Sequence, residues 1–315
     1  RTTMASETLP NYTPPKTIVV KPAALDIGAE ICGVELSQPL SGPQKKEIWA
    51  AFVQWKVIYF RNQKLNKRSF INFSRQFGAL NRGHNIHDVD PKFPEIYGVV
   101  KGRQSNRQSG QPAFDPWTGW HTDLTPAVNP PTASILWGEV VPPNAGDTQW
   151  TNLVAAYDAL SPAMKEIIDG LRGVHTYLNY GGITPTSEYL ERIAKNQKVS
   201  EHPIVRVHPE SEEKALWVSP KFLLEIVGMT PTESNAMLAM LKTHAIRPEF
   251  TYRLRWEPGS VVMWDNRSTS HLAPRDLQRD DHDRKLFRTT LVGDLPVGVD
   301  GRKSKALKGT PLLAA

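Results

Sequence analysis

The stretch Gly259–His271, "GSVVMWDNRSTSH", joins an apolar run to a turn and a histidine. Val261–Trp264 is short and wholly apolar, which is typical of a buried strand. Asp265 and Asn266 are residues that favour turns, and His271 comes seven residues after Trp264. The segment therefore predicts a buried strand, a turn and a candidate functional histidine in close succession.

Other segments of the second half share the features of this strand, because they are short and bounded by turn residues. They are Ala133–Trp137, Asp147–Thr151, Pro203–His208, Ala215–Val218, Tyr252–Trp256 and Phe287–Val292. Their spacing is irregular, so it does not fit a doubly wound parallel sheet, in which strands alternate regularly with helices. The chain also lacks a G-x-G-x-x-G fingerprint and a P-loop. We expect a mainly β protein, an antiparallel sandwich or jelly roll with helical cover.

Helical cover is predicted at three places. Ser41–Lys56 carries apolar residues at helical spacing, with Ser41 as a candidate N-cap. A second apolar stripe, Phe70–Phe77, is followed by Gly78 as a helix end, and "TPTE" at Thr230 begins a third helix with a capping box. Between the first two helices, Val57–Phe60 ("VIYF") predicts a buried strand. These apolar stripes are interpreted as core packing.

Composition places the chain among ordinary globular proteins. Of its 315 residues, 39% are hydrophobic and 22% are charged, and no apolar run approaches the roughly 20 residues needed to cross a bilayer. We expect a flexible N-terminal segment over residues 1–16 and a single domain over residues 17–315. The lone cysteine, Cys32, excludes an internal disulfide and favours the cytoplasm. We interpret it as a small buried apolar residue.

The formal net charge of +6 raises the possibility of nucleic-acid binding. The basic residues are spread along the chain, however, whereas nucleic-acid sites usually cluster them on one element. We therefore expect a small anionic organic substrate as the partner, with neither nucleic acid nor a membrane.

The motif "WHTD", Trp120–Asp123, places a histidine and a carboxylate two residues apart. In a strand these two side chains point to the same face. With His271 as a third ligand they form the two-histidine, one-carboxylate set of a non-haem iron(II) site, which leaves three positions open for a 2-oxo acid and dioxygen. Two other interpretations stay open at this level, a hydrogen-bonded surface pair and a zinc site of a hydrolase.

Several motifs in order make the sequence closely similar to the taurine dioxygenase family of Fe(II)/2-oxoglutarate oxygenases. They include "WHTD", "AGDTQW" (Ala145–Trp150), "WDNRSTSH" (Trp264–His271) and "RKLFRTTLVGD" (Arg284–Asp294). The tail "LVGDLPVGVDG" (Leu291–Gly301) resembles the alkylsulfatase branch most. The resemblance implies a double-stranded β-helix, or jelly roll, with flanking α-helices, and assembly as a dimer or tetramer.

The resemblance also implies a role for each site residue. His121, Asp123 and His271 would bind Fe(II). Thr148 and Arg284 would bind the far carboxylate of 2-oxoglutarate, which with O2 completes the set of cosubstrates. Arg288 would face the anionic head of the substrate, near which we expect Phe222, His84, Tyr180 and Trp117.

Ordinary structural roles compete with some of these assignments. Thr148 could be a plain strand residue, and Arg288 could pair with Asp294 or Asp276. We interpret three further histidines as structural: His175, His202 and His208.

Two departures from taurine-specific members bear on the substrate. Trp117 replaces an asparagine shortly before the metal histidine, and Tyr180–Gly181 replaces a serine–phenylalanine pair. An indole and a phenol there argue against taurine and favour a longer or more apolar tail. The predicted reaction is hydroxylation of the carbon next to the heteroatom of an alkyl sulfate ester or sulfonate, which releases an aldehyde with sulfate or sulfite, succinate and CO2. The alternatives are the same chemistry on an organic carboxylate such as an aryloxyalkanoate, a zinc hydrolase, and a basic nucleic-acid-binding protein.

Overall fold

The computed structural model describes residues 15–83, 89–101, 115–178, 187–274, 276 and 280–315. Most of the predicted flexible segment, residues 1–14, lies outside this part of the chain, and so do the site candidates His84 and Tyr180.

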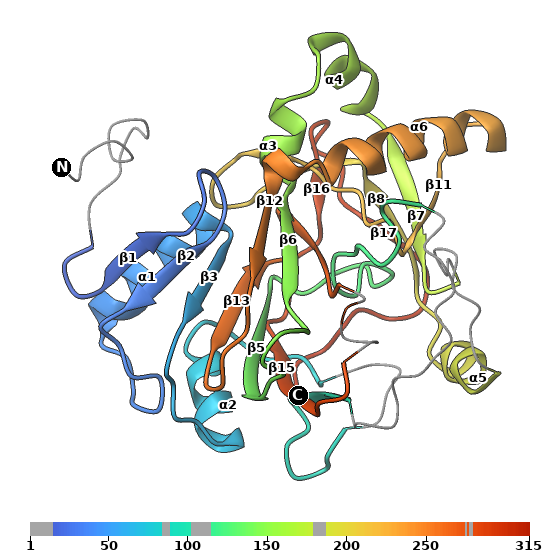
Figure 1. Ribbon diagram of the computed structural model, residues 1–315. Helices are drawn as coiled ribbons and strands as arrows, with labels where there is room; N and C mark the ends of the chain where they lie inside the picture. Colours follow the sequence, from blue (N-terminus) through green and yellow to red (C-terminus); the bar gives the residue numbers. More distant parts are fainter. Residues whose placement is uncertain (1–14, 84–88, 102–114, 179–186, 275, 277–279) are drawn as a thin grey trace.

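The largest sheet has seven strands and forms one layer of the molecule (Figure 1). Every neighbouring pair is antiparallel except β2 and β3, which are parallel. The spatial order is β1 (Val19–Pro22), β2 (Ala29–Cys32), β3 (Val57–Phe60), β13 (Val261–Asp265), β5 (Ala133–Val140), β15 (Arg284–Thr290) and β4 (Tyr97–Lys101).

Strand β13 shows how this sheet separates two cores. Val261 and Met263 pack in a cluster with apolar residues of α1 (Gly42–Trp55) and α2 (Lys67–Arg75). Val262 and Trp264, which point to the opposite face because successive strand residues alternate, pack in a second cluster with Trp150 and Leu254. The two helices thus cover the outer face, and the inner face meets another sheet.

That inner partner is a three-stranded antiparallel sheet of β12 (Thr251–Leu254), β6 (Thr148–Asn152) and β14 (Thr269–Leu272). Two sheets facing each other across a core of aromatic and aliphatic side chains form the double-stranded β-helix that the sequence predicts. The prediction of a jelly roll with flanking helices is confirmed.

The remaining elements extend the roll and cap it. A four-stranded sheet has the order β11 (Leu223–Ile226), β7 (Arg172–Thr176), β8 (Val199–Pro203) and β17 (Lys305–Lys308). A smaller one has the order β10 (Lys214–Leu216), β9 (Val205–Val207) and β16 (Val297–Gly298). Around them lie α3 (Leu153–Asp158), α4 (Pro162–Ile168), α5 (Ser187–Lys195), α6 (Pro231–Ala245) and the 3-10 helix η1 (Pro248–Phe250).

The predicted helix starts are confirmed in detail. Ser41 caps α1 and Thr230 caps α6, each with a complete capping box. The second helix ends at Arg75, three residues before the Gly78 that was expected to terminate it. Cys32 is half-buried rather than buried. Lys56 continues α1 into a left-handed turn with φ +63° and turns the chain directly into β3.

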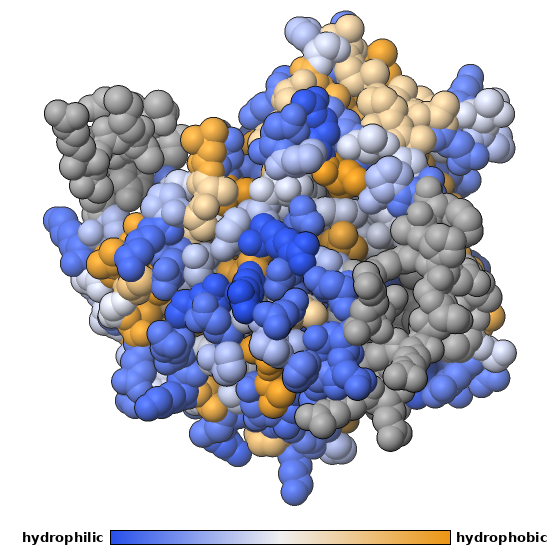
Figure 2. Space-filling view, in the orientation of Figure 1, coloured by the Kyte–Doolittle hydropathy of each residue, from blue (hydrophilic) through white to orange (hydrophobic). Residues whose placement is uncertain are grey.

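The visible surface is mostly hydrophilic, with apolar residues in small separate patches (Figure 2). Among the described residues, no helix combines the length and the hydropathy that a membrane crossing requires.

Candidate active site

His121, Asp123 and His271 converge at one end of the roll. One potential ligand atom from each of the three lies within 4.8 Å of the others. His271 lies on β14, and His121 joins it through an isolated antiparallel bridge, in which each backbone N–H donates to the other residue's carbonyl at 2.9 and 2.7 Å. The two imidazole rings lie 4.2 Å apart, centre to centre. The structure therefore brings together the three residues that the sequence selected.

The "WHTD" motif does not form the strand that we predicted. Its pairing is limited to the single bridge at His121, and the chain turns at Asp123. Leu124 follows with φ +53°, a left-handed conformation that costs a non-glycine residue about 1 kcal/mol. This sharp turn, rather than strand alternation, holds Asp123 next to His121.

The tautomer of His121 suits a metal ligand. Its Nδ1 donates to the Gly119 carbonyl at 2.9 Å, which leaves Nε2 with a free lone pair. The Nε2 atoms of His121 and His271 lie 3.9 and 4.0 Å from Asp123 Oδ1. Burial lowers the pKa of His121 well below its usual range and that of His271 to about 4, so both imidazoles are neutral near pH 7.

Asp123 is held as a carboxylate chiefly by Arg288 and Ser134. Burial alone would raise its pKa, but the positive charge of Arg288 and a hydrogen bond from Ser134 favour the ionised form and help to lower the pKa. Arg288 donates to Oδ1 at 2.8 Å and Ser134 donates to Oδ2 at 2.7 Å. Two neutral imidazoles and one ionised carboxylate are the donor set that Fe(II) takes in a facial triad, so these residues fit the metal.

Residues outside the motif hold Asp123 in place, and no sequence pattern pointed to this role. Asn266 donates from its side chain to Ser134 Oγ at 2.9 Å and accepts from the Asp123 backbone N–H at 3.4 Å. Ser134 of β5 pairs with Trp264 near the end of β13, and Asn266 follows that strand directly. Serine and asparagine are common in turns, so only the fold shows that these two support the ligand.

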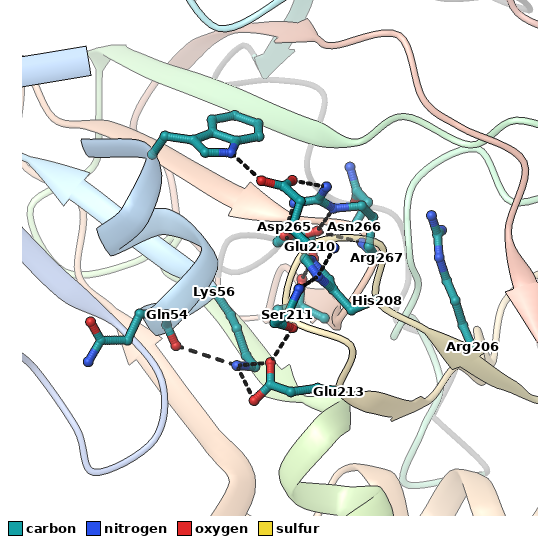
Figure 3. Close-up of polar contacts among 12 residues, drawn as sticks. Gln54, Lys56, Arg206, His208, Glu210, Ser211, Glu213, Asp265, Asn266 and Arg267 are labelled. Carbon is teal, nitrogen blue, oxygen red and sulfur yellow. Dashed lines mark hydrogen bonds and ion pairs between the residues drawn. The ribbon is translucent and has the colours of Figure 1, made fainter. Parts of the chain in front are cut away.

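A buried polar network fixes the turn from β13 to β14 (Figure 3). Arg267 donates two hydrogen bonds to the Asp265 carboxylate at 2.9 and 2.7 Å, and His208 Nε2 lies 3.0 Å from the same group. Glu210 binds Arg267 at 2.5 Å and accepts from the Trp49 indole at 2.6 Å. The interpretation of His208 as structural agrees with this arrangement, since it supports the turn that carries Asn266 and leads to His271.

Arg284 contacts the chain just before Thr148, the other residue expected to bind 2-oxoglutarate. Arg284 donates to the Gly146 carbonyl at 3.1 Å, two residues before Thr148. The Thr148 hydroxyl oxygen accepts from the Trp256 indole at 3.0 Å, so its proton is free to be donated elsewhere. Arg284 is buried and its Nε has no hydrogen-bond partner among the described residues. A cation and a hydroxyl donor side by side fit the far carboxylate of 2-oxoglutarate.

Arg288 pairs with neither Asp294 nor Asp276, the two structural partners considered from the sequence. Asp294 pairs with Arg206 at 2.6 Å, and Asp276 pairs with Arg253 at 2.8 Å. Arg288 instead bonds Asp123, while its Nε is buried without a partner in the described part of the chain.

Two of the expected wall residues are described. The Phe222 ring meets the His121 ring edge-on, with centres 6.0 Å apart. Trp117 is half-buried in the turn that leads into His121.

Comparison with known proteins supports the same assignment. Residues 19–290 match the model of the family described as "Taurine catabolism dioxygenase TauD, TfdA family". The chain belongs to this taurine dioxygenase family. It is therefore an Fe(II)- and 2-oxoglutarate-dependent dioxygenase, an oxidoreductase that uses O2.

Relatives of this family cover nearly the whole chain. The chain is 38% identical over 298 residues to an alpha-ketoglutarate-dependent sulfate ester dioxygenase from Pseudomonas putida, covering 92% of this chain and 94% of the relative. It is 35% identical over 289 residues to an alkylsulfatase from Acinetobacter baylyi, with coverages of 89% and 86%. A crystal structure of a taurine dioxygenase from Burkholderia xenovorans superposes with a TM-score of 0.81 and 50% identity, covering 93% of this chain and 97% of that one.

Proposed function

We propose that this dioxygenase hydroxylates the carbon next to the heteroatom of an alkyl sulfate ester or sulfonate. One atom of O2 enters the substrate C–H bond and the other enters succinate, as 2-oxoglutarate loses CO2. The hydroxylated carbon then loses its bond to the sulfate oxygen or to sulfur, and the hydroxyl proton leaves. The products are an aldehyde and sulfate or sulfite.

The position of Arg288 is the observation that supports this proposal most directly. Its guanidinium is buried within hydrogen-bond distance of Asp123, so a group bound to it lies beside the metal ligands. Its Nε has no partner among the described residues, and a buried unpaired donor favours an acceptor from outside the chain. A planar guanidinium binds the oxygens of an anionic head group well, and this contact would fix the distance between the head group and the C–H bond that reacts.

The other residues have separate tasks. Bound iron, with 2-oxoglutarate and O2, would supply the oxidation. Asp123 and the two neutral histidines would hold the metal, and Arg284 with Thr148 would orient 2-oxoglutarate. The names of the two relatives, a sulfate ester dioxygenase and an alkylsulfatase, support a sulfur-containing substrate. Trp117, in the turn that leads into His121, supports an apolar tail.

The alternative within this chemistry is an organic carboxylate, which a guanidinium binds equally well. The test is succinate formation with Fe(II), ascorbate and 2-oxoglutarate across alkyl sulfates, alkyl sulfonates and aryloxyalkanoates, with sulfate and sulfite assayed together. We expect substrate-dependent succinate matched by sulfate or sulfite. Succinate with carboxylates alone would retain the iron chemistry and refute the sulfur assignment.

Three further expectations from the sequence, on domain organisation, assembly and location, are also proposed here. We propose a single domain, assembly as a dimer or tetramer, and a cytoplasmic location, the last supported by a single cysteine that is free. Partners other than a small anion are not proposed.

A further inference from the structure

The segment Ser219–Phe222 is attached to the metal-binding motif on both sides of His121. The Thr122 backbone N–H donates to Ser219 Oγ at 3.0 Å. The Lys221 backbone N–H donates to the Trp120 carbonyl at 3.1 Å. These two bonds flank His121 and fix the backbone of Lys221 beside the ligand.

The ammonium group of Lys221 lies over the adjacent aromatic ring. Its Nζ is 5.3 Å from the centre of Phe222, whose ring meets His121 edge-on. Within the described ranges this ammonium makes neither an ion pair nor a hydrogen bond, unlike Lys214 upstream, which pairs with Asp169 at 2.9 Å. Lys221 is half-buried, and a partly desolvated cation without a fixed ion-pair partner is stabilised when an anion joins it.

The backbone bond from Lys221 to Trp120 brings its charge near the candidate metal ligands. The charge of Lys221 contributes to the lowered pKa of both His121 and His271, after burial. Burial chiefly lowers the pKa of Lys221 itself, while Asp123 raises it and Arg288 lowers it. Lys221 and Arg288 are therefore two cations, from different elements, that act on the same small region.

We infer that Lys221 is a second cation for the anionic head of the substrate, acting together with Arg288. This inference rests on the proposed function and refines it. A sulfate ester or sulfonate has three terminal oxygens, so a guanidinium and an ammonium can each donate to a different one. A carboxylate has two oxygens and uses both in a bidentate contact with a guanidinium, so no third oxygen is left for the ammonium. A site with two separate cations thus favours the tetrahedral sulfur head group.

Substitution of Lys221 tests the inference. Lys221→Met keeps most of the side-chain length and removes the charge, whereas Lys221→Arg retains the charge. Lys214→Met is the matched control, because it removes a lysine of the preceding strand β10 whose ammonium pairs with Asp169. Binding of n-hexyl sulfate is measured by calorimetry on protein loaded anaerobically with Fe(II) and 2-oxoglutarate, since the absence of O2 prevents turnover. KM values and thermal unfolding are measured in parallel.

We expect Lys221→Met to weaken n-hexyl sulfate binding about 10- to 100-fold, as loss of a charge-assisted contact does. The KM for 2-oxoglutarate and the unfolding temperature should be unchanged. Lys221→Arg should retain most of the affinity, and Lys214→Met all of it.

Unchanged n-hexyl sulfate binding in a folded Lys221→Met variant would overturn the inference and leave the proposed function intact. An equal loss of 2-oxoglutarate binding would also overturn it, because Lys221 would then shape the site as a whole. If Lys221→Met does not fold, loss of binding in folded Lys221→Arg decides against the inference, and retention decides for it. Wild-type protein that neither binds n-hexyl sulfate nor releases sulfate would refute the sulfate ester function, and the inference with it.

Discussion

Arg284 and Arg288 lie four residues apart on β15, on the same face of the strand. Both are buried, yet each has a different neighbour: Arg284 meets the Gly146 carbonyl, and Arg288 meets the Asp123 carboxylate. Burial lowers the pKa of Arg284 to about 10, which still leaves it charged at neutral pH. One strand thus presents two buried cations, Arg284 for the proposed cosubstrate site and Arg288 beside the candidate metal ligands.

At this scale we predict that Arg284→Met raises the KM for 2-oxoglutarate by at least about tenfold, because a charge-assisted contact to its far carboxylate is lost. Steady-state kinetics with varied 2-oxoglutarate would check this. Lys285→Met is the control, since the neighbouring Lys285 pairs with Glu139 at the surface at 2.5 Å. Equal effects of the two substitutions would count against the assignment.

Among the elements, the turn between β13 and β14 contains a buried ion pair. Burial would raise the pKa of Asp265, but Arg267 and His208 lower it, so the group is a carboxylate inside the protein. Arg267 compensates it from only two residues away. In this turn a buried ion pair satisfies the carboxylate, whereas in most turns water solvates the polar groups.

We predict that Arg267→Met destabilises the protein by about 3–5 kcal/mol, because it leaves a buried carboxylate without its cation. Denaturant unfolding measures this change. Arg302→Met, which removes an exposed partner of Asp300, should cost about 0–1 kcal/mol. A small effect of Arg267→Met would mean that His208 alone compensates Asp265.

Sequence patterns predicted those elements that contain a recognisable motif, such as a capping box or an apolar run. The capping boxes at Ser41 and Thr230 and the apolar run of β13 fall in this class, and the "WHTD" motif pointed to candidate metal ligands that the structure brings together. Strand β14 ("TSHL") lacks apolar alternation, and β7 and β8 carry buried histidines at inward positions, so none of the three was predicted. Lys221 was missed for another reason: only its backbone bond to Trp120 places an ordinary lysine beside the site.

At the scale of the whole molecule, two buried neutral histidines link folding to pH. His202 lies between the Ser304 hydroxyl at 2.7 Å and the Thr125 carbonyl at 2.7 Å, and its ring contacts His175 edge-on. Burial lowers the pKa of His202 to about 3 and lowers that of His175 well below its usual range. The unfolded chain binds these protons from about pH 6.5 downward, whereas the folded chain does not.

We therefore predict that stability falls as the pH decreases from about 6.5 towards 3, with each such histidine contributing about 1.4 kcal/mol per pH unit. His121 and His271 shift in the same direction, so the informative quantity is the difference between wild type and His202→Gln. That variant should show a shallower dependence of the unfolding free energy on pH. His282→Gln, at an exposed position, should keep the wild-type slope, and identical slopes in all three proteins would contradict the prediction.

The attachment of Ser219–Phe222 to the metal motif has a consequence for how such an enzyme can change. The bonds that hold this segment use the Ser219 hydroxyl, the Trp120 carbonyl and backbone N–H groups, and none uses the side chain at position 221. That side chain can be exchanged without releasing His121 from its neighbour. Position 221 is therefore where divergence or directed evolution can alter head-group selectivity while the oxidation chemistry stays intact.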